Sequence, residues 1–108
     1  MKIVKDEGVY KASRIAGPKH NFLGLGITGV SPPDVQCIQR TLRDDGASQI
    51  NEEQLLAAVS EGVSVANREL GASLFVERIE YVPTDTPEYN TYQELAKAII
   101  LSAAKDFN

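Results

Sequence analysis

The chemistry that this chain can support is limited by a few side chains and one glycine pattern. Residues 24–29 read GLGITG, which matches the glycine spacing of dinucleotide-binding sites. In those sites the glycines turn a strand into a helix whose N-terminus binds a pyrophosphate. Here Gly24 and Gly26 fall within a predicted strand, and any helix begins only after Ser31. A packing role is therefore favoured over a nucleotide site, and no cofactor is expected.

Cys37 and His20 are the only thiol and the only imidazole in the sequence. Together they could supply a nucleophile and its general base. However, Cys37 lies in an apolar pattern typical of a buried, inert cysteine, whereas His20 lies in a predicted turn. One cysteine and one histidine also lack the spaced ligand set of a zinc site. The sequence therefore predicts no catalytic residues and no metal site, and we expect a protein that is not an enzyme.

Basic side chains are concentrated near the start of the chain. Residues 1–20 carry five basic and two acidic side chains, whereas the rest of the chain carries six basic and thirteen acidic ones. The net charge of −4 excludes a broadly basic nucleic-acid binder, but a local basic group can still contact phosphates. The candidate binding site for RNA or a partner comprises Lys11, Arg14, Lys19, His20 and Asn21. An ordinary solvated hairpin is the alternative interpretation.

Length and composition describe one globular domain. The chain has 108 residues, of which 43% are hydrophobic and 24% are charged, and no repeat or linker divides it. We therefore expect a single domain over residues 1–108. A single cysteine excludes an internal disulfide and favours a reducing, cytoplasmic setting. Charges at the N-terminus argue against a signal peptide, and no apolar segment is long enough to span a membrane.

A hairpin is predicted before residue 30. Residues 9–15 alternate loosely between apolar and polar side chains, and residues 22–28 place their leucines and isoleucine on one face. Turn-forming residues at 17–21 join the two strands, which predicts a hairpin with a long tip. The two glycines on the other face of the second strand predict that another backbone or a helix packs closely there.

Residues 31–46 fit two different structures. Ser31 is suited to cap a helix that has Pro32 at its first position and Gly46 as its C-terminal stop. Residues 35–42 can equally form a strand that ends in a turn. Local signals favour the helix slightly.

Stronger signals follow in the second half of the chain. A capping box at Asn51 and Gln54 and an apolar stripe predict a helix over 52–70, which Gly71 ends. A β-favouring run then predicts a strand over 74–82.

The last predicted element is another helix. A second capping box, Thr91 with Glu94, predicts its start, and its apolar spacing continues to about residue 106. A polar loop at 84–90 precedes it, bracketed by Tyr81 and Tyr89. These tyrosines could line a ligand cleft, although such residues more often bury the ring and keep the hydroxyl in water.

Read in order, these elements resemble domain IV of elongation factor G, the translocation GTPase of the ribosome. Residues 10–22 resemble its first strand and glycine-rich turn, and residues 23–27 resemble the returning strand. The other similar segments are 37–40 for the third strand, 52–71 for the first helix, 76–81 for the final strand and 95–100 for the final helix. The resemblance covers nearly the whole chain and rests on order and spacing, with few identities.

The resemblance implies the fold of ribosomal protein S5 domain 2. This is an α+β, two-layer βββαβα sandwich with two helices on one face of a mixed sheet. It implies that residues 35–43 form a strand, against the local preference for a helix. It also implies that the loops at 17–21 and 84–90 lie together at one end, where the family reaches the ribosomal decoding region. No P-loop is present, which excludes GTP hydrolysis by this chain.

These observations predict a stand-alone, non-enzymatic binding module. We expect it to contact RNA or a protein through the hairpin at 11–21. The alternative is a small-ligand-binding protein or small enzyme that uses the Gly24 and Gly26 surface or a cleft near Tyr81 and Tyr89. A third possibility is a subunit of an assembly, including a homo-oligomer, that docks by a sheet edge or a helix face.

Overall fold

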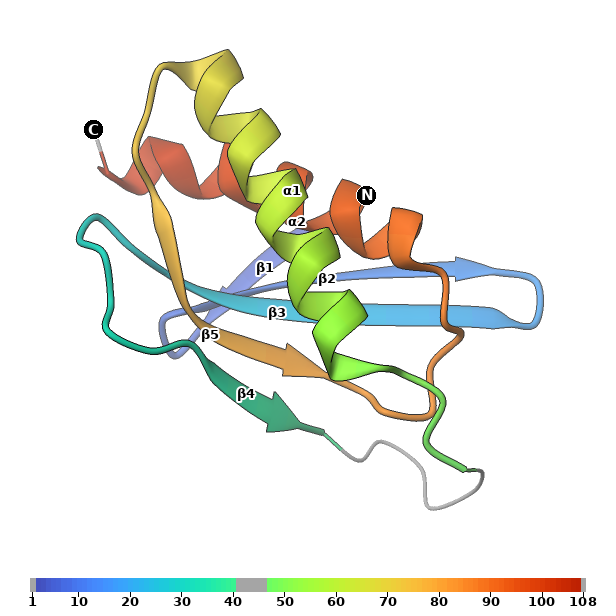
Figure 1. The fold of residues 1–108 in the computed structure, drawn as a ribbon. Coiled ribbons are helices and arrows are strands. Elements are labelled where there is room, and N and C mark those ends of the chain that lie inside the picture. The colour runs from blue at the N-terminus through green and yellow to red at the C-terminus, as the bar shows by residue number, and fades with distance from the viewer. Residues whose placement is uncertain (1, 41–46, 108) are drawn as a thin grey trace.

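Two helices lie on one face of a five-stranded sheet in the computed structural model, as Figure 1 shows. The structure describes residues 2–40 and 47–107. The strands are β1 (Ile3–Asp6), β2 (Val9–Ala16), β3 (Lys19–Thr28), β4 (Gln36–Gln39) and β5 (Phe75–Tyr81). The helices are α1 (Glu52–Leu70) and α2 (Tyr89–Ala103), followed by a short 3-10 helix at Ala104–Phe107. The predicted two-layer α+β fold is confirmed, and β1 adds a strand that was not predicted.

Both strand directions occur in the sheet. The strands lie in the order β1-β2-β3-β5-β4, and all neighbours are antiparallel except β4 and β5. Parallel neighbours require a crossover connection, which α1 supplies between β4 and β5. The predicted mixed sheet is therefore confirmed.

The hairpin between β2 and β3 has a tight turn. Ala16 pairs with Lys19, so Gly17 and Pro18 alone form the turn. Gly17 has a φ of 63°, a left-handed conformation that glycine adopts without a steric penalty. The predicted long tip at 17–21 is wrong, because residues 19–21 continue the strand.

Strand β4 decides between the two structures that the sequence allowed for residues 31–46. Gln36–Gln39 pair in parallel with β5, and the Arg40 N–H continues this pairing by donating to the Tyr81 carbonyl at 2.7 Å. The helix favoured by local signals is wrong here, because pairing with a distant strand outweighs local propensity. The strand implied by the resemblance is confirmed at these four residues. Residues 35 and 40 flank β4 and are not part of it, and residues 41–43, together with Gly46, lie outside the described residues.

The caps of α1 agree with the sequence, but the start of α2 does not. The Asn51 side chain accepts a hydrogen bond from the Gln54 N–H at 3.0 Å, and Gly71 ends α1 in the left-handed conformation. Helix α2 begins at Tyr89, so Thr91 is buried inside the helix and caps nothing. The predicted capping box at Thr91 is therefore wrong.

The hydrophobic core lies between the sheet and the helices. Alternation along the strands directs one set of side chains toward the helices: Tyr10, Ala12, Leu23, Leu25, Ile79 and Tyr81. They pack against residues of α1 and α2, of which the largest buried ones are Tyr92, Leu55, Leu95, Ile99, Ile100 and Val59. Neither helix in the described part of the chain combines the length and apolar composition of a membrane-spanning segment.

The two helices approach each other most closely at Gly62. A Cβ atom at this position would overlap the carbonyl oxygen of Gln93 and lie 3.0 Å from the Ala96 side chain. Since only a glycine leaves room for the α2 backbone there, Gly62 sets the separation of the helices.

Candidate functional site

The strand residues that point away from the helices form a surface that no helix in the described part of the chain covers, and we call it the open face. Figure 1 shows both helices on the opposite side of the sheet. The register between strands assigns to the open face Val4, Lys11, Ile15, His20, Phe22, Ile38, Arg78 and Glu80. Ile15 is the most exposed of its large apolar side chains, at 69%.

The hairpin residues predicted to bind a partner are divided between the two sides of the sheet. Lys11 and His20 lie on the open face, whereas Arg14, Lys19 and Asn21 point toward the helix side. This division follows from the alternation of side chains along paired strands. The structure therefore does not bring the five residues into one contiguous patch.

Each cation of the hairpin is balanced by a carboxylate close by. The pairs are Lys11 with Asp6 at 3.2 Å, Arg14 with Glu94 at 2.8 Å and Lys19 with Glu88 at 2.7 Å. Two of these carboxylates belong to α2 and the residue before it. The local positive charge counted in the sequence is therefore largely compensated in the fold.

Asn21 anchors the loop at 84–88 to the hairpin. Its side chain is only 3% exposed and donates to the Thr86 carbonyl at 2.7 Å, while the Thr86 N–H donates to the His20 carbonyl at 3.1 Å. Asp85 accepts a hydrogen bond from the Phe22 N–H at 2.8 Å. Burial raises the pKa of the Asp85 carboxyl, although this hydrogen bond and nearby His20 lower it. The loop therefore lies beside β3, at the hairpin end of the sheet.

Glu80 is a buried carboxylate on the open face. It is 2% exposed, and its Oε2 atom accepts a hydrogen bond from Arg78 Nε at 2.9 Å. Arg40 Nη1 lies 3.3 Å from the other oxygen, Oε1, but outside hydrogen-bonding geometry. Within the described residues Oε1 therefore has no hydrogen-bond partner. The side chains of Arg40 and Arg78 stay 45% and 39% exposed.

Gly24 and Gly26 make room for this arrangement. A Cβ atom at Gly24 would lie 3.1 Å from Val9 Cγ1 and 3.2 Å from Glu80 Cβ, and one at Gly26 would lie 3.0 Å from Arg78 Cβ. The close approach expected at the glycines is therefore confirmed, but it is made by side chains of neighbouring strands. The expected backbone or helix over these glycines is wrong. The surface considered for a small ligand is covered by Val9, Glu80 and Arg78.

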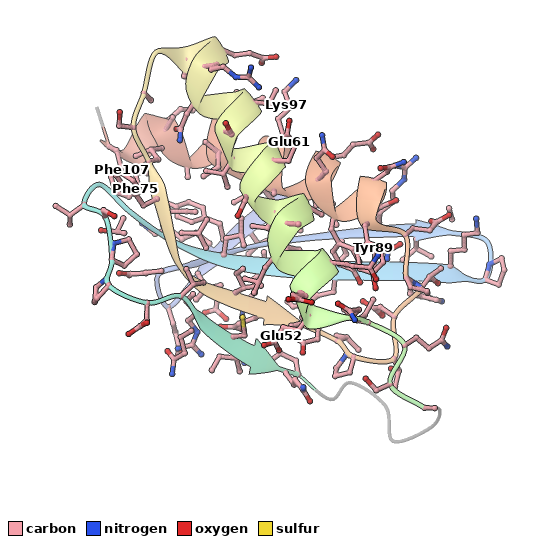
Figure 2. The ribbon with its side chains drawn as sticks, viewed as in Figure 1. Glu52, Glu61, Phe75, Tyr89, Lys97 and Phe107 are labelled. Atoms are coloured by element: carbon pink, nitrogen blue, oxygen red, sulfur yellow. The ribbon has the colours of Figure 1, made fainter. Side chains whose placement is uncertain are left out.

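Tyr81 and Tyr89 make separate contacts within the fold. The Tyr81 hydroxyl donates to Glu52 Oε2 at 2.7 Å and accepts from Gln39 Nε2 at 3.1 Å. Burial, together with the hydrogen bond to Glu52, raises the pKa of Tyr81 to about 12. The Tyr89 hydroxyl accepts from the Asn51 N–H at 2.9 Å. Figure 2 shows Glu52 and Tyr89 near the N-terminal ends of α1 and α2.

Cys37 and His20 are not brought together. Cys37 is half-buried on the helix side, where burial raises the pKa of its thiol and Glu52 adds to the effect. A thiol held in its protonated form is a poor nucleophile. His20 lies on the open face, on a different strand. Among residues 2–40 and 47–107, no group of three or more potential ligands is placed to hold a metal ion.

Sequence reasoning missed two features of the described structure. One is the Glu80 site, for which the available signal was an acidic residue within a β-favouring run. The other is an apolar groove of about 440 Å³ between α1 and β5. Its signal was Leu56, an apolar residue beside the predicted stripe of α1.

Comparison of the chain with protein-family models, with curated proteins and with solved structures finds no match. The geometry of the chain itself is therefore the basis for its functional interpretation.

Proposed function

We propose that this chain is a non-enzymatic binding module that docks on an acidic protein surface through the open face of its sheet. The observation that carries the proposal is the arrangement of Arg40 and Arg78 around buried Glu80. Two half-exposed guanidinium groups are held beside one buried carboxylate, whose Oε1 atom accepts no hydrogen bond from any described residue.

Holding arginines in place before binding favours affinity. The Arg78 side chain is already hydrogen-bonded to Glu80, so ordering it against a partner costs less entropy than ordering a free side chain. A guanidinium group also retains several donors after one has been used, and it binds carboxylates in a bidentate geometry. A polypeptide can supply the carboxylates that the two arginines would bind.

The apolar surroundings support a protein as the partner. Ile15 and Val4 are exposed on the open face, and Phe22 and Ile38 are half-buried there. Apolar side chains and arginines on one face match the composition of protein–protein interfaces, in which Arg and Phe are enriched.

RNA fits these observations less well. Open sheets that bind RNA stack bases on exposed aromatic rings. Among the described strands, the open face carries one aromatic ring, that of Phe22. The chain is also acidic overall, and its hairpin cations are paired with carboxylates. Lys11 and His20 remain part of the proposed protein contact because they share the open face.

We also propose, as a separate point, a relationship with domain IV of elongation factor G. It is supported by the order of the elements from β2 onward and by the closeness of residues 19–21 to the 84–88 loop. A cytoplasmic location belongs to the same proposal. The proposed docking of an acidic protein does not depend on this relationship.

The test introduces negative charge on the open face, including a position directly beside Arg78. Ser13 and Gln36 are exposed and point to this face, so S13E combined with Q36E should repel an acidic partner. A16E is the matched control, because Ala16 is exposed on the same hairpin but points to the other side. Thermal unfolding followed by circular dichroism confirms that each variant folds.

Binding is measured with a partner that is captured from cells, purified and titrated by calorimetry. We expect at least a tenfold loss of affinity for S13E/Q36E and no change for A16E. Amide chemical shifts should change on β2, β3, β4 and β5 when the partner is added. An equal loss of affinity in A16E, or chemical-shift changes confined to α1 and α2, would contradict binding through the open face. If the wild type binds poly(U) in a salt-dependent way and S13E/Q36E does not, the partner of the open face would be RNA and not a protein.

A further inference from the structure

An apolar groove of about 440 Å³ lies between α1 and β5, on the helix side of the sheet. Val59 and Val63 form its wall on α1, and Val76 and Ile79 line it from β5. Val35, just before β4, lines it as well. The volume lies in the range of ordinary small-molecule sites, which are mostly apolar with a few polar groups.

Polar groups of the groove follow one line along α1. Ser60, Ser64 and Arg68 are spaced four residues apart, so they share one stripe of the helix and form a rim. Val59 and Val63 lie one position before the two serines and therefore face deeper into the groove. The groove thus has an apolar interior and one polar edge.

One end of the groove is closed by Asn67. Its side-chain amide donates to the Leu74 carbonyl at 2.9 Å and accepts from the Leu74 N–H at 3.1 Å. These two bonds tie the end of α1 to the start of β5 and use the groups that a ligand would otherwise contact. Figure 2 shows Phe75 at this end of the molecule, well separated from Glu52 at the start of α1.

Arg68 supplies the charge at the closed end. It is exposed and forms no ion pair with any described residue, whereas its neighbour Glu69 pairs with Lys97 at 2.9 Å. A guanidinium without a carboxylate, at the end of an apolar groove, is complementary to an anion with an apolar tail.

We propose that this groove binds an apolar carboxylate of the fatty-acid class. The hydrocarbon chain lies against Val63, Val76 and Ile79, and the carboxylate lies at Arg68. Ser64, on the same rim, is placed to donate a second hydrogen bond to the carboxylate. The site is separate from the open face, so the inference does not rest on the proposed protein docking.

Decanoate is the probe, with decanol as the uncharged comparison. Both are titrated into isotopically labelled protein, and amide chemical shifts report where they bind. We expect shift changes within 56–68 and 74–79 and at least tenfold tighter binding of decanoate than of decanol. Shortening the chain to octanoate should weaken binding by up to about fourfold for each methylene removed from the groove.

The variant R68Q tests the assigned role of the cation. Arg68 is exposed, so its replacement should leave the fold intact. We expect R68Q to bind decanoate and decanol equally, with decanol affinity unchanged. K105Q is the matched control, because Lys105 is exposed and lies outside the groove, and it should bind both ligands as the wild type does. S13E/Q36E should also retain decanoate binding, which separates this proposal from the docking of a protein.

Three results would overturn the proposal. They are the absence of shift changes in the groove, equal affinity of the wild type for decanoate and decanol, and decanoate binding that R68Q leaves unchanged. Groove shifts produced by the captured protein partner but by neither decanoate nor decanol would assign the groove to a peptide instead.

Discussion

Arg78 Nε donates a hydrogen bond to Glu80 Oε2 at 2.9 Å, across two positions of one strand. Alternate residues of a strand point to the same face, so both side chains lie on the open face of the sheet. Glu80 is nevertheless almost fully buried, whereas Arg78 and Arg40 reach solvent. The buried charge of Glu80 is therefore balanced by the two arginines, whereas water can solvate the arginines if Glu80 is replaced.

This asymmetry predicts unequal effects of substitution. Replacing both arginines in R40Q/R78Q leaves a buried carboxylate without an ion pair, which should lower the free energy of unfolding by about 3 kcal/mol. E80Q keeps the shape of the side chain and lets the arginines turn to water, so its cost should be about 1 kcal/mol. Urea unfolding measures both. A larger loss in E80Q than in R40Q/R78Q would contradict the assigned dependence.

Gly62 provides a second test of packing. G62A should gain about 1 kcal/mol of intrinsic helix propensity. The new methyl group would overlap the Gln93 carbonyl, and separating the helices costs about 1–3 kcal/mol more than is gained. We therefore expect a net loss of stability in urea unfolding. S64A, on the exposed side of the same helix, is the control and should change stability by less than about 0.5 kcal/mol. A stabilised G62A would contradict the close approach of the helices.

Local chemistry predicted helix α1 correctly but misplaced the start of α2 at Thr91. Helix α1 was found with both ends because Asn51 and Gly71 act within one turn of it. Strand β4 was ambiguous because its pairing partner, β5, follows only after α1 in the chain. Its four residues carry no local signal strong enough to exclude a helix.

The candidate site was harder to predict than the fold. Lys11 and Arg14 are close in sequence but point to opposite sides of the hairpin, and a count of charges contains no such information. Arg78 and Glu80 belong to β5, and Arg40 directly follows β4, a strand that meets β5 only in the folded sheet. Residues that are close in the sequence were therefore assigned to one site although the fold separates them. Residues that are distant in the sequence were not assigned to one site although the fold brings them together.

Asn21 and Lys19 should respond very differently to replacement by alanine, although both belong to the hairpin site predicted from the sequence. N21A removes a buried side-chain donor, and the Thr86 carbonyl keeps only its hydrogen bond from the Glu88 N–H at 2.8 Å, so we expect a loss of about 1–2 kcal/mol. K19A removes an exposed ion pair with Glu88 and should cost less than about 1 kcal/mol. Thermal unfolding at two salt concentrations distinguishes them, because only the small effect of K19A should depend on salt. Equal and small losses would indicate that Asn21 does not anchor the 84–88 loop.

Tyr81 predicts how stability changes at alkaline pH. An unfolded tyrosine loses its proton near pH 10, whereas burial and the bond to Glu52 raise the pKa of Tyr81 to about 12. Between these values the unfolded chain binds fewer protons than the native one, so the free energy of unfolding falls as pH rises. For this one group, the free energy of unfolding falls by up to about 1.4 kcal/mol per pH unit. The full stabilising contribution of Tyr81 is present below pH 10.

Comparison of the wild type with Y81F isolates this contribution. At neutral pH, Y81F should lose about 1 kcal/mol because its hydrogen bonds to Glu52 and Gln39 are gone. From pH 10 to 12 its stability should fall less steeply than that of the wild type, so the two curves approach each other and then cross. Tyr10, whose pKa is also raised to about 12 by burial and by Asp106, contributes equally to both proteins and does not obscure the difference. Parallel curves over this range would show that the Tyr81 hydroxyl titrates at the same pH in the folded and unfolded chain.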